Sequence, residues 1–326
     1  MARVSTAITK RAGLIVNPRA GRGAGKGLAL AEKLKDDPLI KILILEQFGQ
    51  LESELRKMAT EGVTDLFISS GDGTIQAILT ILAEHRPFST PPRVGLLPHG
   101  TTNLSARDLG FRNRSLDAQA DFLRKCEALD VITRHTIRCA NPADGMVRHG
   151  MFVGTGAVAE ATRYCQTAFN EQGMKGQLAV ATTLLRGVAQ HLLSEPQPGD
   201  DTRFDRPFAI TVETEDQRLT DGPQLLQMST TLSQLVLGAR PFWGGGHGMI
   251  RTTVLPFPVP SVLRWILPVM YGGANRATPP GAVSFRSDEV KVTTRTMFVI
   301  DGEFFQPPEN EPLQMNTGPS FSFIKG

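Results

Sequence analysis

The chain has 326 residues, of which 40% are hydrophobic and 21% are charged, and its formal net charge is +3. This length suits about two globular domains with sizeable cores. The slight net charge argues against a nucleic-acid-binding protein, which would need clustered basic residues. The three cysteines form no C-x-x-C pair, so we expect neither a zinc site nor a disulfide framework. These features are typical of a cytoplasmic protein.

The chain is not expected to cross a membrane. Residues 1–11 are polar and basic, and the apolar run at 12–16 is too short for the core of a signal peptide. The most apolar late segment, residues 254–273, contains four prolines and Arg264, whereas a spanning helix needs roughly 20 largely apolar residues. We therefore expect no transmembrane segment.

Strand-like and helical patterns alternate through residues 1–127, which we expect to form the first domain. The strand-like runs are 13–17, 40–45, 65–69 and 94–97, and the helical patterns are 28–35, 51–59, 74–84 and 115–128. This alternation predicts a doubly wound α/β domain with a parallel sheet. In such a sheet the ligand binds at the carboxyl ends of the strands.

The pattern changes to mainly β in residues 128–326, the second expected domain. The expected strands are 136–139, 147–153, 208–213, 232–237, 289–294 and 297–300, with helices at 158–168 and 177–193 and a polar loop at 194–205. Short alternating runs of this kind predict a mainly antiparallel β domain.

The third expected strand ends in Ser70-Gly71-Asp72-Gly73-Thr74, immediately before an apolar helical pattern. The two glycines let backbone N–H groups approach a polyanion, and the start of the helix favours negative charge. Asp72 is an acid at a place that suits phosphate, which would repel it. Its presence makes sense if a Mg²⁺ ion lies between the two, or if Asp72 accepts the proton of an attacking hydroxyl. The alternative is a plain turn, because Gly and Asp are common turn residues.

Two further strands end in loops of similar character. Asn17 and Pro18 lead into a glycine-rich run that contains Gly21 and Lys26, and the strand at 94–97 leads into a loop with Gly100, Thr101 and Asn103. The first loop matches neither the G-x-x-x-x-G-K-[ST] spacing nor the G-x-G-x-x-G spacing. Three strands thus end in loops suited to one polyphosphate.

Taken in order, N-P-x-x-G at 17–21, S-G-D-G-T at 70–74 and L-P-x-G-T-x-N at 97–103 resemble the catalytic domain of the diacylglycerol kinase and sphingosine kinase family of lipid kinases. The resemblance covers residues 12–160 and resumes at D-G-E, residues 301–303. It implies ATP and Mg²⁺ as cofactors and a lipid hydroxyl as acceptor, met at the membrane surface by a peripherally associated enzyme. It also implies a C-terminal β-sandwich whose last segment returns to the first domain.

The resemblance and the loop chemistry together define the expected site. Asp72, Glu303 and Asp130 are the expected catalytic residues, and Asp72 is the expected metal ligand. The expected nucleotide-binding residues are Asn17, Pro18, Gly21, Ser70, Gly71, Gly73, Thr74, Gly100, Thr101 and Asn103. Without the resemblance, residues 301–303 would be interpreted as a hairpin turn, because Asp-Gly is a strong turn signal.

Several alternatives stay open at this stage. NAD kinase shares a G-G-D-G-T loop, but no Asn-Glu ribose-binding motif follows here. Many bacterial relatives carry acids where this chain has Leu104 and Val158, which also admits a nucleotide- or lipid-binding protein without transfer activity. The apolar segment 257–271 fits either a domain core or a lid or membrane-facing edge. A homodimer is compatible with the sequence.

Overall fold

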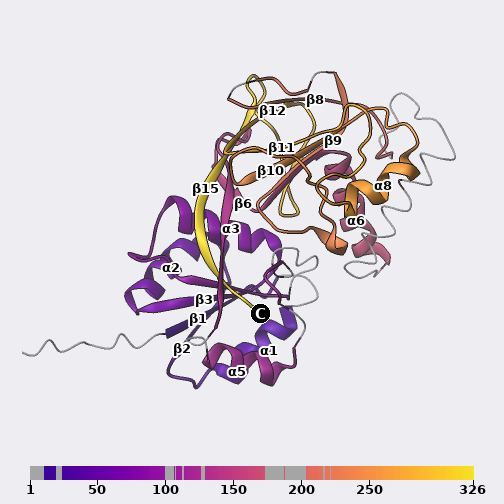
Figure 1. Ribbon diagram of the computed structural model, residues 1–326. Helices are drawn as coiled ribbons and strands as arrows, with labels where there is room; N and C mark the ends of the chain where they lie inside the picture. Colours follow the sequence, from indigo (N-terminus) through magenta and orange to yellow (C-terminus); the bar gives the residue numbers. More distant parts are fainter. Residues whose placement is uncertain are drawn as a thin grey trace, which may run out of the picture. The chain divides into compact units, whose positions relative to one another are not determined.

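The computed structural model describes residues 11–19, 24–99, 106, 108–111, 114–125, 129–172, 187, 203–215, 217–220 and 222–326 (Figure 1). The chain divides into two compact units. The first unit is Met1–Arg134 with Phe321–Gly326, and the second unit is His135–Ser320. The assignment of a nucleotide role to one part and a lipid role to the other stays a prediction.

The first unit is a parallel sheet with helices. Its elements are β1 (Arg11–Val16), α1 (Ala24–Leu34), β2 (Ile40–Ile44), the short 3-10 helix η2 (Phe48–Gln50), α2 (Leu51–Thr60), β3 (Val63–Ser69), α3 (Asp72–Glu84), β4 (Arg93–Leu97) and α5 (Leu116–Arg124). The strands are parallel in the order β2-β1-β3-β4. The end of β15 (Leu313–Ile324) adds a parallel neighbour to β4, where Phe323 lies opposite Val94.

Continuous apolar runs explain this sheet. In β3 every residue except Thr64 is buried, as expected of a parallel strand covered on both faces. In α2 the buried residues Leu51, Leu55 and Met58 lie on one face of the helix. Figure 1 shows α2 and α3 on one face of the strands and α1 and α5 on the other. The carboxyl ends of β1, β3 and β4 therefore share one edge of the first unit.

The second unit is built mainly from antiparallel strands. Its elements are β5 (Val131–Cys139), β6 (Arg148–Gly150), β7 (Phe152–Gly156), α6 (Ala157–Gln172), β8 (Phe208–Glu213), β9 (Pro223–Thr230), the 3-10 helix η4 (Val236–Gly238), β10 (Ile250–Pro256), α8 (Val262–Tyr271), β11 (Val283–Ser287), β12 (Glu289–Thr294), β13 (Phe298–Ile300), β14 (Glu303–Phe305) and most of β15. The order β14-β13-β7-β9-β8-β12-β15 is antiparallel throughout, and β10 pairs with both β9 and β11.

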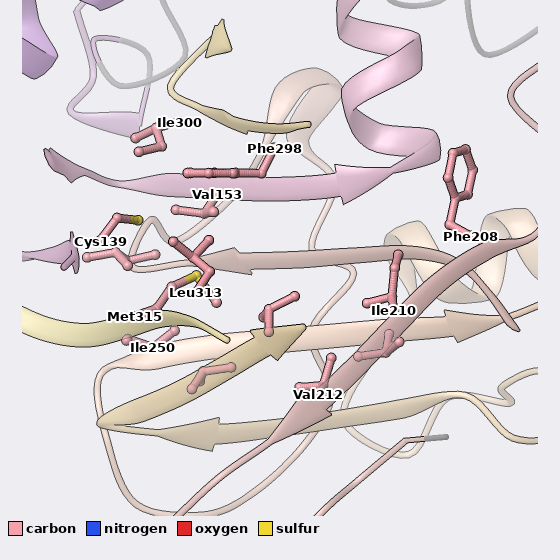
Figure 2. Packing of buried hydrophobic residues seen from close by; sticks show 14 of the residues in the cluster. Cys139, Val153, Phe208, Ile210, Val212, Ile250, Phe298, Ile300, Leu313 and Met315 are labelled. Atoms are coloured by element: carbon pink, nitrogen blue, oxygen red, sulfur yellow. The ribbon is translucent and has the colours of Figure 1, made fainter. Parts of the chain in front are cut away.

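These strands enclose one hydrophobic core. Figure 2 shows side chains from β5, β7, β8, β10, β13 and β15 gathered in it. Its buried members are Ile137, Cys139, Val153, Ala157, Phe204, Phe208, Ile210, Val212, Ile250, Val254, Val290, Val292, Phe298, Ile300, Leu313 and Met315. Burial of an aliphatic or aromatic side chain contributes roughly 1.5–3 kcal/mol, so this core is the main source of stability of the second unit.

The observed strands confirm the predicted fold class, although β9, β10, β11, β14 and β15 were not among the strands expected. Three of the expected segments also differ in detail. Residues 232–237 were expected to form a strand but do not, because Leu237 and Gly238 adopt left-handed backbone angles, with φ of 58° and 73°. The expected strand 147–153 is divided at Met151, whose N–H bonds to the carboxylate of Asp301 instead of continuing a ladder. The segment 257–271 contains α8, which its prolines concealed.

Two expected segments of the second unit lie largely outside the described residues. The helix expected at 177–193 lies outside the described residues except for Gly187, and the loop expected at 194–205 is described only from Arg203. Within the described ranges, no helix has both the length and the apolar character needed to pass through a bilayer.

Candidate functional site

Asn17 joins the ends of β1 and β3 to the start of α3. Its backbone N–H donates to the carbonyl of Ser69 at 3.2 Å, and its side-chain Nδ2 donates to Oγ1 of Thr74 at 2.9 Å. Its Oδ1 accepts from the N–H of Arg19 at 2.9 Å, which shapes the turn that contains Pro18. Asn17 of the first motif and Thr74 of the second are therefore in direct contact.

Helix α1 approaches the same point very closely at Gly27. A Cβ atom on Gly27 would lie 2.2 Å from Oγ of Ser69 and 2.9 Å from Cγ1 of Val16. Real Cβ atoms do not tolerate such distances, because close-packed interiors leave no spare volume. Only glycine therefore allows the first turns of α1 to pack against the ends of β1 and β3.

The loop after β4 reaches this cluster through His99. Its Nδ1 lies 2.8 Å from Oγ of Ser69, and both residues are 2% exposed. Burial lowers the pKa of His99 to about 4, and the nearby positive charge of Lys26 lowers it as well. The imidazole is therefore neutral at neutral pH and acts as a hydrogen-bonding group. Ser69 is the point where residues from all three loops meet.

The Ser70-to-Thr74 segment forms the start of α3. Gly71 is the N-cap residue of the helix, and no side chain caps the helix there. The first hydrogen bond of the helix runs from the N–H of Ile75 to the carbonyl of Gly71 at 3.3 Å. Helices leave their first N–H groups without intrahelical partners, and these groups bind anions. A Cβ on Gly71 would meet none of the described residues within 4 Å, and its φ of −83° suits any residue. The described part of the chain therefore does not need glycine there and leaves room for a ligand beside it.

Ser70 supplies a second sign of a missing polar partner. Its side chain is fully buried, and its Oγ has no hydrogen-bond partner among the described residues. An unsatisfied buried hydroxyl costs about 1–3 kcal/mol, and a native structure rarely keeps one without a water, an ion or a ligand. The orphaned hydroxyl and the open face of Gly71 together fit a phosphate at the start of α3.

A metal at this site would depend on Asp72. This residue is partly exposed in the first turn of α3, beside the half-buried Gly73. The described part of the chain contains no group of three or more His, Cys, Asp or Glu side chains that could cage a metal. Mg²⁺ commonly uses one or two carboxylates together with substrate phosphates. Asp72 therefore fits a Mg²⁺ ion shared with a nucleotide.

The other expected residues of the first unit fall into two groups. Asp130 is exposed immediately before β5, and its backbone carbonyl accepts from Lys325 N–H at 2.8 Å. Among the described residues, no hydrogen bond or ion pair joins its carboxylate to the cluster around Ser69. Four expected binding residues lie outside the described residues; they are Gly21, Gly100, Thr101 and Asn103.

Glu303 belongs to the second unit, where it begins β14 and is exposed. It follows a two-residue hairpin turn in which Asp301 and Gly302 have φ of 46° and 95°. Such a turn requires left-handed angles at both positions, which Asp-Gly adopts readily. Residues 301 and 302 therefore form the hairpin turn that the Asp-Gly pair predicted, and Glu303 follows directly after the turn.

Asp301 is the residue whose importance the sequence did not reveal. Its buried carboxylate accepts from the N–H groups of Met151 at 2.9 Å and Phe152 at 2.9 Å. Burial raises the pKa of Asp301 to about 7, although these backbone bonds act in the opposite direction. The D of D-G-E thus fixes the hairpin against the start of β7. The D-G-E motif itself was the only signal that could have found it.

Val158 stands in the first turn of α6, at the position where the family resemblance leads us to expect an acid. A Cβ on Gly154 would lie 2.5 Å from Cγ1 of Val158, so the valine lies directly over the glycine. An apolar side chain takes this position in the second unit.

Comparison with known proteins agrees with the geometry of the first unit. Residues 11–137 match the family model of the diacylglycerol kinase catalytic domain. The resemblance to the lipid kinases is confirmed. The matched segment contains the described contacts of Asn17, Gly27, Ser69 and His99 and the start of α3.

Similar curated proteins carry related names. A "Diacylglycerol kinase" of Staphylococcus carnosus (strain TM300) is 27% identical over 139 residues, which are 40% of this chain and 39% of that protein. A "Probable lipid kinase YegS-like" of Xanthomonas oryzae pv. oryzae (strain MAFF 311018) is 28% identical over 138 residues, which are 40% of this chain and 45% of that protein. The match therefore spans less than half the length of each of these relatives.

Solved structures show the same fold over nearly the whole chain. A crystal structure of a diacylglycerol kinase from Bacillus anthracis str. Sterne has a TM-score of 0.62 and 16% identity, and covers 97% of both chains. A second structure from that organism, of a candidate diacylglycerol kinase, has a TM-score of 0.65 and 17% identity, with 100% of this chain and 99% of that chain covered. The likeness extends the fold assignment to the β-rich second unit.

Proposed function

We propose that this protein is an ATP- and Mg²⁺-dependent lipid kinase that phosphorylates the hydroxyl group of a diacylglycerol-like or sphingoid lipid. In this reaction the hydroxyl oxygen forms a bond to the γ-phosphorus, the bond from that phosphorus to the bridging oxygen breaks, and ADP leaves. Phosphoryl transfer of this kind depends on positioning and on neutralising charge. The chain's residues are suited to both tasks.

The observation that carries the proposal is the meeting of the three motif-bearing loops at Ser69, beside the start of α3. Backbone N–H groups of the first turn of α3 would bind a nucleotide phosphate, with the hydroxyl of Ser70 near it and no side chain on Gly71 to block its approach. Thr74 is held in place by Asn17. The expected contacts of Gly21, Gly73, Gly100, Thr101 and Asn103 belong to the same proposal.

Asp72 has two candidate roles. As a ligand it would hold Mg²⁺, which supplies positive charge against the phosphates. As a base it would accept the proton that the lipid hydroxyl loses. Glu303 and Asp130 are the proposed carboxylates for the remaining proton and metal chemistry; both are exposed. A Mg²⁺ titration of the rate of Asp72→Asn distinguishes the two roles of Asp72. Loss of a metal ligand raises the Mg²⁺ concentration needed for half-maximal rate, whereas loss of a base lowers the rate without raising that concentration.

The acceptor is proposed to be a lipid because the matched family and the curated relatives are lipid kinases. A long-chain lipid hydroxyl lies at the surface of a bilayer, so the enzyme would work while peripherally attached to a membrane, on its cytoplasmic side. Its product would enter phospholipid metabolism.

The test is transfer of label from γ-labelled ATP with Mg²⁺ to a panel of acceptors in mixed micelles, with NAD as a soluble acceptor in parallel. Label in one lipid class that disappears with Asp72→Asn but persists with Asp36→Asn, a change at another exposed acid of the first unit, supports the proposal. Label in NAD would instead assign NAD kinase. Binding of ATP without label in any acceptor would assign a binding protein.

A further inference from the structure

Helix α8 has an apolar surface that remains exposed among the described residues of the second unit. Arg264 is its only charged residue, and its other residues are apolar or aromatic. Leu263, Leu267 and Tyr271 are 57%, 65% and 51% exposed, and their spacing of four residues places them on one face of the helix. We call these three side chains the α8 ridge. A helix at a water-facing surface normally carries polar residues on its outer face, so this ridge is unusual for a solvent-exposed helix.

The ridge is held in place by a well-bonded helix end. Nη1 of Arg276 donates to the carbonyls of Val269 and Arg240, and the N–H of Arg240 donates to the carbonyl of Met270 at 2.7 Å. Oη of Tyr271 donates to the Leu237 carbonyl at 3.3 Å. These bonds fix the carboxyl-terminal end of α8 against its neighbours. The exposure of the ridge is therefore a property of the packed helix.

The chain around α8 carries positive charge only. Residues 222–287 contain five arginines and neither aspartate nor glutamate. Arg264 is exposed on the helix itself, and Arg240 is exposed beside its carboxyl-terminal end. The guanidinium of Arg264 stacks over the ring of Trp265, with 4.7 Å between its central carbon and the ring centroid. An apolar ridge beside arginines and aromatic rings complements an anionic lipid surface, where apolar side chains enter the acyl boundary and basic groups meet the headgroups.

We infer that α8 is the element that docks this protein on an anionic membrane, with the α8 ridge inserted at the boundary between headgroups and acyl chains. The choice of a membrane over a protein partner rests on the proposed function, since a long-chain lipid acceptor is reached only at a bilayer. Arg240 and Arg264 lie at the level of the lipid phosphates in this arrangement. The ridge then loses its contact with water.

Vesicle flotation tests this docking directly. Full-length protein is mixed with vesicles of phosphatidylcholine alone or with 30% phosphatidylglycerol, and compared with the double variant Leu263→Glu, Leu267→Glu. We expect the wild type to float with the anionic vesicles and the double variant to lose at least ten-fold in partitioning. Met146→Glu is the matched control, because Met146 is an equally exposed apolar residue of the same unit, 58% exposed, away from α8 in sequence. All proteins are first compared by circular dichroism and melting temperature, which exposed substitutions should leave unchanged.

Trp265 provides a second measurement at the helix itself. The chain has two tryptophans, so Trp243→Phe leaves Trp265 as the only one and keeps a ring beside Arg276. Docking through α8 predicts a blue shift of its emission on anionic vesicles and quenching by brominated lipid chains. Unchanged emission, or equal flotation of the wild type and the double variant, would overturn the inference. The inference would also be overturned if neither protein binds vesicles and the wild type is a dimer whereas the double variant is a monomer.

Kinase assays separate this inference from the proposed function. If both hold, the double variant phosphorylates a short-chain acceptor dispersed as monomers at the wild-type rate, and loses activity only on vesicles. If the wild type floats through α8 but labels no acceptor, docking stands and the kinase proposal fails. If the double variant labels vesicle lipid as fast as the wild type, the kinase stands and the α8 inference fails.

Discussion

Replacing Gly27 with alanine tests the close approach of α1 to the strand ends. The new methyl carbon would lie 2.2 Å from Oγ of Ser69, whose hydroxyl also bonds to His99. Overpacking of this kind costs about 1–3 kcal/mol, while alanine gains about 0.5–1 kcal/mol over glycine in a helix. The net expectation for Gly27→Ala is a loss of roughly 0–2.5 kcal/mol of unfolding free energy.

Gly25→Ala is the matched control in the same helix. A Cβ at Gly25 would meet none of the described residues within 4 Å, so only the helical gain applies and this variant should be as stable as the wild type or slightly more so. Urea unfolding followed by circular dichroism should then show Gly27→Ala about 1–3 kcal/mol less stable than Gly25→Ala. ATP affinity, measured by calorimetry, should fall for Gly27→Ala alone. Equal stability of the two variants would refute the proposed packing of α1 on Ser69.

Three further predictions concern other contacts. Asn17→Ala removes the hydrogen bond to Thr74, worth about 1 kcal/mol, so calorimetry should show roughly five-fold weaker ATP binding; unchanged affinity would contradict the proposed phosphate site. Arg93→Met leaves the fully buried carboxylate of Asp65 without its ion pair, and should lower the unfolding free energy by about 3 kcal/mol. Equal melting temperatures of Arg93→Met and of Arg93→Lys, which keeps the positive charge, would contradict this prediction. Burial raises the pKa of Asp301 from 3.8 to about 7, so its stabilising contribution is complete below pH 3.8 and is lost as the pH rises through about 7. Asp301→Asn should remove this decline, and parallel melting temperatures of the two proteins from pH 4 to 8 would show the reasoning wrong.

The first unit was largely predictable from the sequence because its signals are local. Buried parallel strands read as continuous apolar runs, and the segment 65–69 lies within β3 as expected. The start of α3 followed from glycines before an apolar helical pattern. The contacts of Ser69 could not be predicted, because they join residues 30 or more positions apart. The need for glycine at position 27 depends on the same contacts and was equally hidden.

The second unit was harder because its strands are short and its turns override local preference. Residues 232–237 have strand-like composition, but Leu237 turns into the left-handed region. Helix α8 was concealed by the prolines before and within it. The role of Asp301 depends on burial under residues 150 positions earlier. The family resemblance identified residues 301–303, yet only the structure separates the buried Asp301 from the exposed Glu303.

The most direct test of the central claim is phosphate transfer from ATP to a lipid by the purified full-length protein. Diacylglycerol and a sphingoid base are offered in mixed micelles with Mg²⁺, and wild type, Asp72→Asn and Asp36→Asn are compared side by side. The account predicts a labelled phospholipid with the wild type and Asp36→Asn, and a loss of at least 100-fold with Asp72→Asn, on the scale of lost acid–base or charge stabilisation. Equal rates for wild type and Asp72→Asn, or label in NAD and in no lipid, would contradict it.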